Sequence, residues 1–199
     1  MATVNNNWPT PVQTDLVKDG WEAIKDLGDA IDTTLGVYAD PGLVLLNTSS
    51  FTGVSAINLT TNTFSATYDN YRILMSVTGS TTAVINVRMR LAGVDNSSAV
   101  YNHQRVDGDG ATAAAVQVTS QTSGRIGVAF TTPSSFTIDC YSPFLVASTL
   151  LTSVNNEKNA LLLSTETVAH VANTSYDSLS FIPASGTITG TVSVYGYNK

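Results

Sequence analysis

The sequence predicts a mainly β protein in which an N-terminal α-helix, forming a short coiled coil, precedes an antiparallel β-sandwich that is jelly-roll-like. Three observations predict this class. Thr and Ser supply 28 and 21 of the 199 residues, and β-branched side chains suit a pleated, half-buried surface. Charge is distributed unevenly along the chain. The spacing of apolar residues also changes from a helical to an alternating period after residue 40.

The charge distribution predicts two domains. Residues 1–40 hold seven acids and two bases, a net charge of −5, whereas residues 41–199 hold eight acids and seven bases, a net charge of −1. We therefore expect an N-terminal anchor and oligomerisation helix over residues 1–40 and a β-sandwich domain over residues 41–199.

The first predicted element is a helix over residues 14–36. Thr14 suits the N-cap, and Asp15 places negative charge in the first turn, where the helix dipole favours it. Gly36 and Pro41 are typical of a helix end. Apolar or small residues recur four and three positions apart, which is the spacing of a heptad seam: Val17, Trp21, Ile24, Gly28, Ile31 and Leu35.

Two interpretations of this helix remain open. Either it packs on its own domain or it joins identical chains. The spacing does not decide between these two, because periods of 3.5 and 3.6 are not separable over so few turns. Gly20 and Gly28 each cost about 1 kcal/mol of helix stability relative to Ala, so an isolated helix is marginal. We favour self-association, and the predicted oligomerisation residues are Val17, Trp21, Ile24, Ile31 and Leu35.

From Leu43 onward, short runs with a period of two predict strands. In residues 84–91, for example, Ile85, Val87, Met89 and Leu91 are expected on one face. Turn-forming clusters separate the runs, and about ten strands without intervening helices predict a two-sheet sandwich. The predicted strands are Leu43–Asn47, Val54–Leu59, Tyr71–Thr78, Ala83–Leu91, Ala114–Thr119, Gly124–Phe130, Phe136–Tyr141, Ala160–Thr165, Leu179–Ile182 and Thr187–Tyr197.

Composition excludes several functions. A pI near 4.6 argues against a nucleic-acid partner, which would require phosphate-neutralising cations. One Cys and two His leave neither a zinc cluster nor a disulfide framework. No apolar run is long enough for membrane insertion, and the N-terminus lacks a signal-peptide pattern. We expect no cofactor and no metal, and a chain made in a cytoplasm.

No residue pattern predicts an enzyme. His103 and His170 are expected to be surface or hydrogen-bonded histidines, since no Gly-x-Ser-x-Gly motif positions a nucleophile. Cys140 shares a strand face with Phe136 and Ile138 and is expected in the core. Residues 107–110, Asp-Gly-Asp-Gly, begin like a calcium loop but lack its later ligands, so a hairpin turn is expected. Seven tyrosines after residue 40 suit sugar or protein surfaces and sandwich edges equally well.

The polar N-terminus, the run of residues 14–32 (TDLVKDGWEAIKDLGDAID) and the Ser/Thr-rich β region resemble small tail-fibre and other virion appendage proteins of tailed bacteriophages. Residues 64–73 (FSATYDNYRI) and 186–197 (GTITGTVSVYGY) share this likeness. The resemblance implies a homotrimer in the virion, docked on a baseplate, tail or capsid by an N-terminal segment in which Trp8, Pro9 and Pro11 are the candidate anchors.

The predicted function is therefore that of a structural virion protein. We expect a short trimeric tail fibre whose β domain faces outward for host-surface attachment, with a host surface glycan as a further candidate partner. A capsid decoration or head-fibre protein is the first alternative. A stand-alone carbohydrate-binding module is the second.

Overall fold

The computed structural model describes residues 20–38, 42–109, 111–157 and 163–198. The chain divides into two units, Met1–Gly42 and Leu43–Lys199. In the first unit, helix α1 spans Gly20–Tyr38, two residues beyond the predicted end, because Gly36 is accommodated inside the helix. Lys25 Nζ lies 2.5 Å from Asp29 Oδ2 one turn away, an exposed pair of the kind that contributes a few tenths of a kcal/mol.

The second unit consists of strands, as the alternating period predicts. Its described residues form β1 (Leu43–Val54), β2 (Ile57–Asn58), β3 (Asn70–Gly79), β4 (Ala83–Leu91), β5 (Val94–Asp95), β6 (Tyr101–Asp109), β7 (Thr112–Gln121), β8 (Gly124–Ala129), β9 (Ser134–Tyr141), β10 (Thr149–Glu157), β11 (Leu163–His170), β12 (Ser178–Pro183) and β13 (Ile188–Tyr197).

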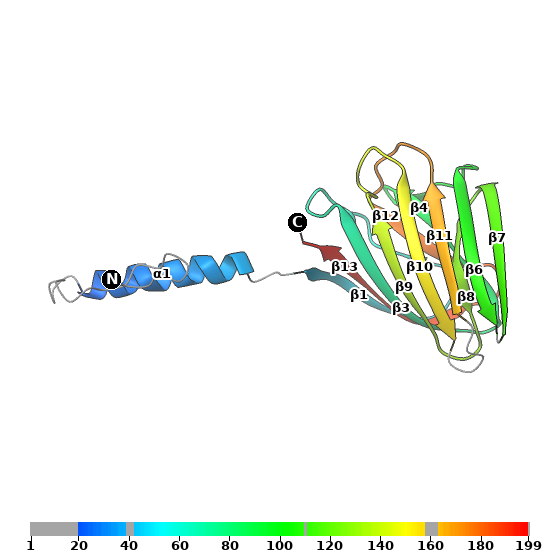
Figure 1. Cartoon of the computed structure of the whole chain (residues 1–199), viewed down its shortest axis with the longest axis horizontal. Helices are drawn as coiled ribbons and strands as arrows, with labels where there is room; N and C mark the ends of the chain where they lie inside the picture. The colour runs from blue at the N-terminus through cyan, green and yellow to red at the C-terminus, as the bar shows by residue number, and fades with distance from the viewer. Residues whose placement is uncertain (1–19, 39–41, 110, 158–162, 199) are drawn as a thin grey trace. The chain divides into compact units, whose positions relative to one another are not determined.

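These strands form two antiparallel sheets, which confirms the predicted sandwich. The larger sheet has eight strands in the order β1-β13-β3-β9-β10-β11-β6-β7. The smaller sheet has the order β2-β12-β4-β5, and β8 also pairs with β4. Figure 1 shows the eight strands of the larger sheet side by side, with β4, β12 and β8 in the second layer.

The core lies between the inward faces of the two sheets. Ile85, Val87 and Met89 of β4 are buried, as the alternation predicts. Leu91, expected on the same face, is instead about half exposed, because β4 ends there at the turn leading into β5. On β9 the burial pattern places Phe136, Ile138 and Cys140 inward, so the prediction for Cys140 is confirmed.

Two long strands were not predicted, β6 and β10. β6 carries His103, Arg105 and Asp107 on its inward side, and β10 includes the polar run Asn155-Asn156-Glu157, whose asparagines are typical of turns. Asn155 is buried because its side chain has partners: Oδ1 accepts from the Val128 amide at 3.0 Å and Nδ2 donates to the Ser135 carbonyl at 3.2 Å. Partners on other strands therefore compensate the polar groups of Asn155.

Tyr101 connects β6 to the smaller sheet. Its buried hydroxyl donates to the Asn96 carbonyl at 2.8 Å and accepts from the Met89 amide at 2.9 Å. Tyr101→Phe leaves that buried amide unpaired, so we expect a loss of about 1–3 kcal/mol in the free energy of unfolding. Urea unfolding measures it. Tyr195→Phe, on the outward side of β13, is the control and should change little.

Candidate functional site

The predicted oligomerisation residues lie on α1 as far as the structure describes them. Trp21 is 69% exposed, Ile24 66% and Leu35 58%, whereas Ile31 is partly buried. Val17 and the candidate anchors Trp8, Pro9 and Pro11 lie outside the described residues. A helix cannot cover its own apolar seam, so large side chains exposed at heptad spacing need a partner surface.

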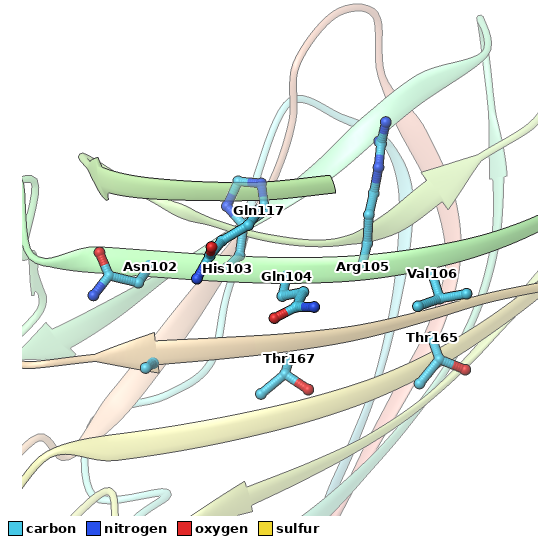
Figure 2. Close-up of a pocket in the computed structure, with 9 residues that line it drawn as sticks. Asn102, His103, Gln104, Arg105, Val106, Gln117, Thr165 and Thr167 are labelled. Atoms are coloured by element: carbon cyan, nitrogen blue, oxygen red, sulfur yellow. The ribbon is translucent and has the colours of Figure 1, made fainter. Parts of the chain in front are cut away.

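A groove lies on the outer face of the larger sheet, meaning the face turned away from the smaller sheet. It has a volume of about 390 Å³ and is formed by β6, β7 and β11. Figure 2 shows Gln104 beside Thr167 and Val106 beside Thr165, while Arg105 extends to the other side of β6. The lining residues are Asn102, His103, Gln104, Arg105, Val106, Gln117, Thr165, Thr167 and Ala169.

The outward side chains of this groove are neutral. Register places Gln104 between Thr167 and Gln117, and Val106 between Thr165 and Ala115. Asn102 Oδ1 already accepts from the Ser120 amide at 2.9 Å. The groove therefore offers amide and hydroxyl hydrogen bonds next to small apolar patches, and it suits an uncharged ligand or another protein surface.

On the inward side of the same strands lies a buried charged cluster. Arg125 Nε of β8 donates to Glu166 Oε1 at 2.8 Å, and the Glu166 side chain is 0% exposed. Ser164 Oγ donates to Asp107 Oδ1 at 2.7 Å and lies 3.1 Å from Glu166 Oε1. Arg105 Nε lies 3.1 Å from Asp107 Oδ2. Two cations thus offset two carboxylates inside the sandwich.

Burial raises the pKa of Glu166 to about 7, and the nearby Asp107 carboxylate acts in the same direction. Glu166 Oε2 has no hydrogen-bond partner within the described part of the chain. Because this carboxyl is shielded from solvent, its role is structural: it ties β11 to β8 through Arg125. Sequence reasoning missed the cluster, since its acids and bases come from β6, β8 and β11 and share no local motif.

The other residues singled out in the sequence have structural roles. His170 lies between the rings of Tyr101 and Tyr176, at centroid distances of 4.6 and 4.9 Å, and its Nε2 is 3.4 Å from the Tyr176 hydroxyl. It is therefore a buried, hydrogen-bonded histidine rather than a surface one. Burial raises the pKa of the Cys140 thiol, which keeps it unreactive. Asp107, Gly108 and Asp109 form the end of β6, which pairs antiparallel with β7 as far as Asp109 and Thr112. A hairpin therefore forms here, but these three residues belong to its strand rather than to its turn, and Gly110 lies outside the described residues.

Among the described residues, no three His, Cys, Asp or Glu side chains gather to hold a metal ion. No helix in the described ranges combines the length and apolar content needed to cross a membrane.

Comparison with known proteins assigns no family. No protein-family model matches the chain, and no curated protein matches it. Among solved structures, galectin LEC-6 from Caenorhabditis elegans is similar at a TM-score of 0.35 and 10% identity, covering 75% of this chain and 96% of that chain. A TM-score this low supports no functional conclusion.

Proposed function

We propose that the protein is a structural virion protein of a tailed bacteriophage, a short trimeric tail fibre made in the host cytoplasm. Its N-terminal residues, Trp8, Pro9 and Pro11 among them, would dock on the particle, and its β domain would face outward for host-surface attachment. The proposal joins the resemblance of the sequence to such appendage proteins with the properties of α1 and the sandwich.

The observation that carries the proposal is the exposed seam of α1. Trp21, Ile24 and Leu35 present large apolar surfaces at positions that a parallel coiled coil buries. A lone helix of 19 residues containing three glycines is marginal in water. Association of three copies removes the seam from water and stabilises the helix at the same time, which supports the coiled coil and the homotrimer.

Strand pairing supports a jelly-roll assignment for the sandwich. If β5–β7 and β10–β11 are set apart as insertions, eight strands remain. The first of these pairs with the last, β1 with β13, and the second with the seventh, β2 with β12. The third pairs with the sixth, β3 with β9, and the fourth with the fifth, β4 with β8. This nesting is that of a jelly roll, an architecture found in viral capsid and lectin domains.

The carbohydrate-binding alternative rests on the neutral groove. Its amide and hydroxyl groups suit a neutral sugar, but among the described residues that line it none is Tyr, Trp or Phe, the aromatic platforms on which a sugar ring packs. The groove therefore argues against a stand-alone carbohydrate-binding module that uses this surface.

Antibody labelling of phage particles tests the location. An antibody against the sandwich, visualised on intact particles by electron microscopy, is expected to mark the tail or baseplate. Label on the head would instead support a capsid decoration or head-fibre protein. Particles that carry no label, while the antibody recognises the free protein, would overturn the virion assignment.

A further inference from the structure

The outer face of the larger sheet carries almost no charge. One row across all eight strands follows the register Thr48, Ser193, Leu74, Thr137, Val154, Thr165, Val106 and Ala115. Among the residues that the structure describes, the neighbouring rows contain a single charged pair, Arg72 and Asp139, joined by two hydrogen bonds of 2.8 Å. A solvated surface usually mixes many charges of both signs, so this face is unusually neutral.

Large apolar side chains interrupt the hydroxyl groups on this face. Leu74, Val154 and Val106 lie on one row, on three different strands, and each is 40–50% exposed. The outer face of the smaller sheet does carry charges. Arg88 and Arg90 of β4 lie on it, and Arg90 Nη1 is paired with Asp95 Oδ1 at 2.6 Å. The larger sheet is therefore the one whose outer face combines partly exposed apolar side chains with very few charged ones.

The area of the face matches that of a stable protein interface. Eight strands at a spacing of about 4.8 Å, with about eight residues each, form a face of roughly 34 Å by 26 Å, or about 900 Å². A standard interface buries about 800 Å² on each partner. The groove of about 390 Å³ on the same face provides a recess into which side chains of a partner fit.

We propose that this outer face is an interface between two copies of the chain, in addition to any contact made by α1. A neutral face meets its own copy without bringing like charges together, whereas a charged partner would find no complementary groups apart from an ion pair already satisfied. If α1 also joins the copies, their sandwiches experience an effective concentration of about 1 mM, so that even a modest affinity closes the interface.

The test uses the full chain with Ile24→Asp and Ile31→Asp, which disables the α1 seam and isolates the sheet contact. Sedimentation equilibrium is expected to show self-association of this chain at or below about 0.1 mM. Adding Val154→Lys should weaken it at least about tenfold, because lysines would face a desolvated neutral surface. Val94→Lys is the matched control, since Val94 is 70% exposed on β5 of the other sheet.

A second measurement uses cysteines in the same seam-disabled chain. Cys140 is fully buried, so Val154→Cys adds an accessible thiol, which a bis-maleimide should cross-link between copies, whereas Val94→Cys should not cross-link. A seam-disabled chain that stays monomeric at about 0.1 mM would overturn the proposal. Equal effects of Val154→Lys and Val94→Lys on self-association would overturn it too. Neither result depends on whether the α1 seam itself trimerises the chain.

Discussion

Replacing Ile24 and Ile31 by Asp should lower the solution mass of the full chain from about three times 20.9 kDa. Each buried Ile side chain contributes about 2 kcal/mol, so a trimer loses roughly 12 kcal/mol from six of them. Charged groups in the seam also repel one another and must be desolvated. Light scattering coupled to size exclusion measures the mass.

Thr33→Asp is the control, because Thr33 is exposed and lies off the seam, where its hydroxyl donates to the Asp29 carbonyl at 2.8 Å. It should leave the mass unchanged. If the seam variant keeps the mass of the unaltered chain, the trimerisation proposal fails. A monomer for both the full chain and a chain beginning at Gly42 would instead favour a helix packed on its own domain.

The second large effect is expected at the buried charged cluster. Arg125→Met removes the guanidinium that binds Glu166 Oε1 at 2.8 Å. The Glu166 side chain, which is 0% exposed, then keeps its buried carboxyl without this cation. Breaking a buried pair from one side costs about 3–5 kcal/mol. Urea unfolding at pH 8, where an ionised Glu166 would lack this cation, should show a loss of this size in the free energy of unfolding.

The same loss should shrink at low pH. Burial places the folded pKa of Glu166 at about 7, above its ordinary value of 4.5, so between these values the folded chain binds the proton more tightly than the unfolded chain does. This group therefore stabilises the fold less as the pH rises from 4.5 to 7. Removing Arg125 raises that pKa further. The variant should consequently be closer to the unaltered chain at pH 5 than at pH 8.

Glu166→Gln in the Arg125→Met background is the matched control. It removes the uncompensated charge while keeping a side chain of similar shape, so it should recover part of the stability at pH 8 and remove most of the difference between pH 5 and pH 8. A loss that does not depend on pH, and that Gln fails to rescue, would mean that Arg125 acts through packing alone.

Local spacing was sufficient to predict the two classes of secondary structure. A helical period over Trp21, Ile24 and Leu35 predicted α1, and the alternation of Ile85, Val87 and Met89 predicted the inward face of β4. Cys140 was placed correctly for the same reason. Each of these predictions uses residues within a few positions of one another, and a strand or helix imposes its period at that range.

Tertiary structure decided which polar residues lie inside. Nothing local indicates that the polar runs of β6 and β10 are strands, because Asp107 and Asn155 favour burial only when partners reach them. Those partners are distant: Asp107 accepts from Ser164, 57 residues away, and Asn155 accepts from Val128, 27 residues away. The sequence by itself determined the periods and the division of charge. Only the fold determined strand order, the buried cluster and the neutral face, because each arises from residues that are brought together when the two sheets pack.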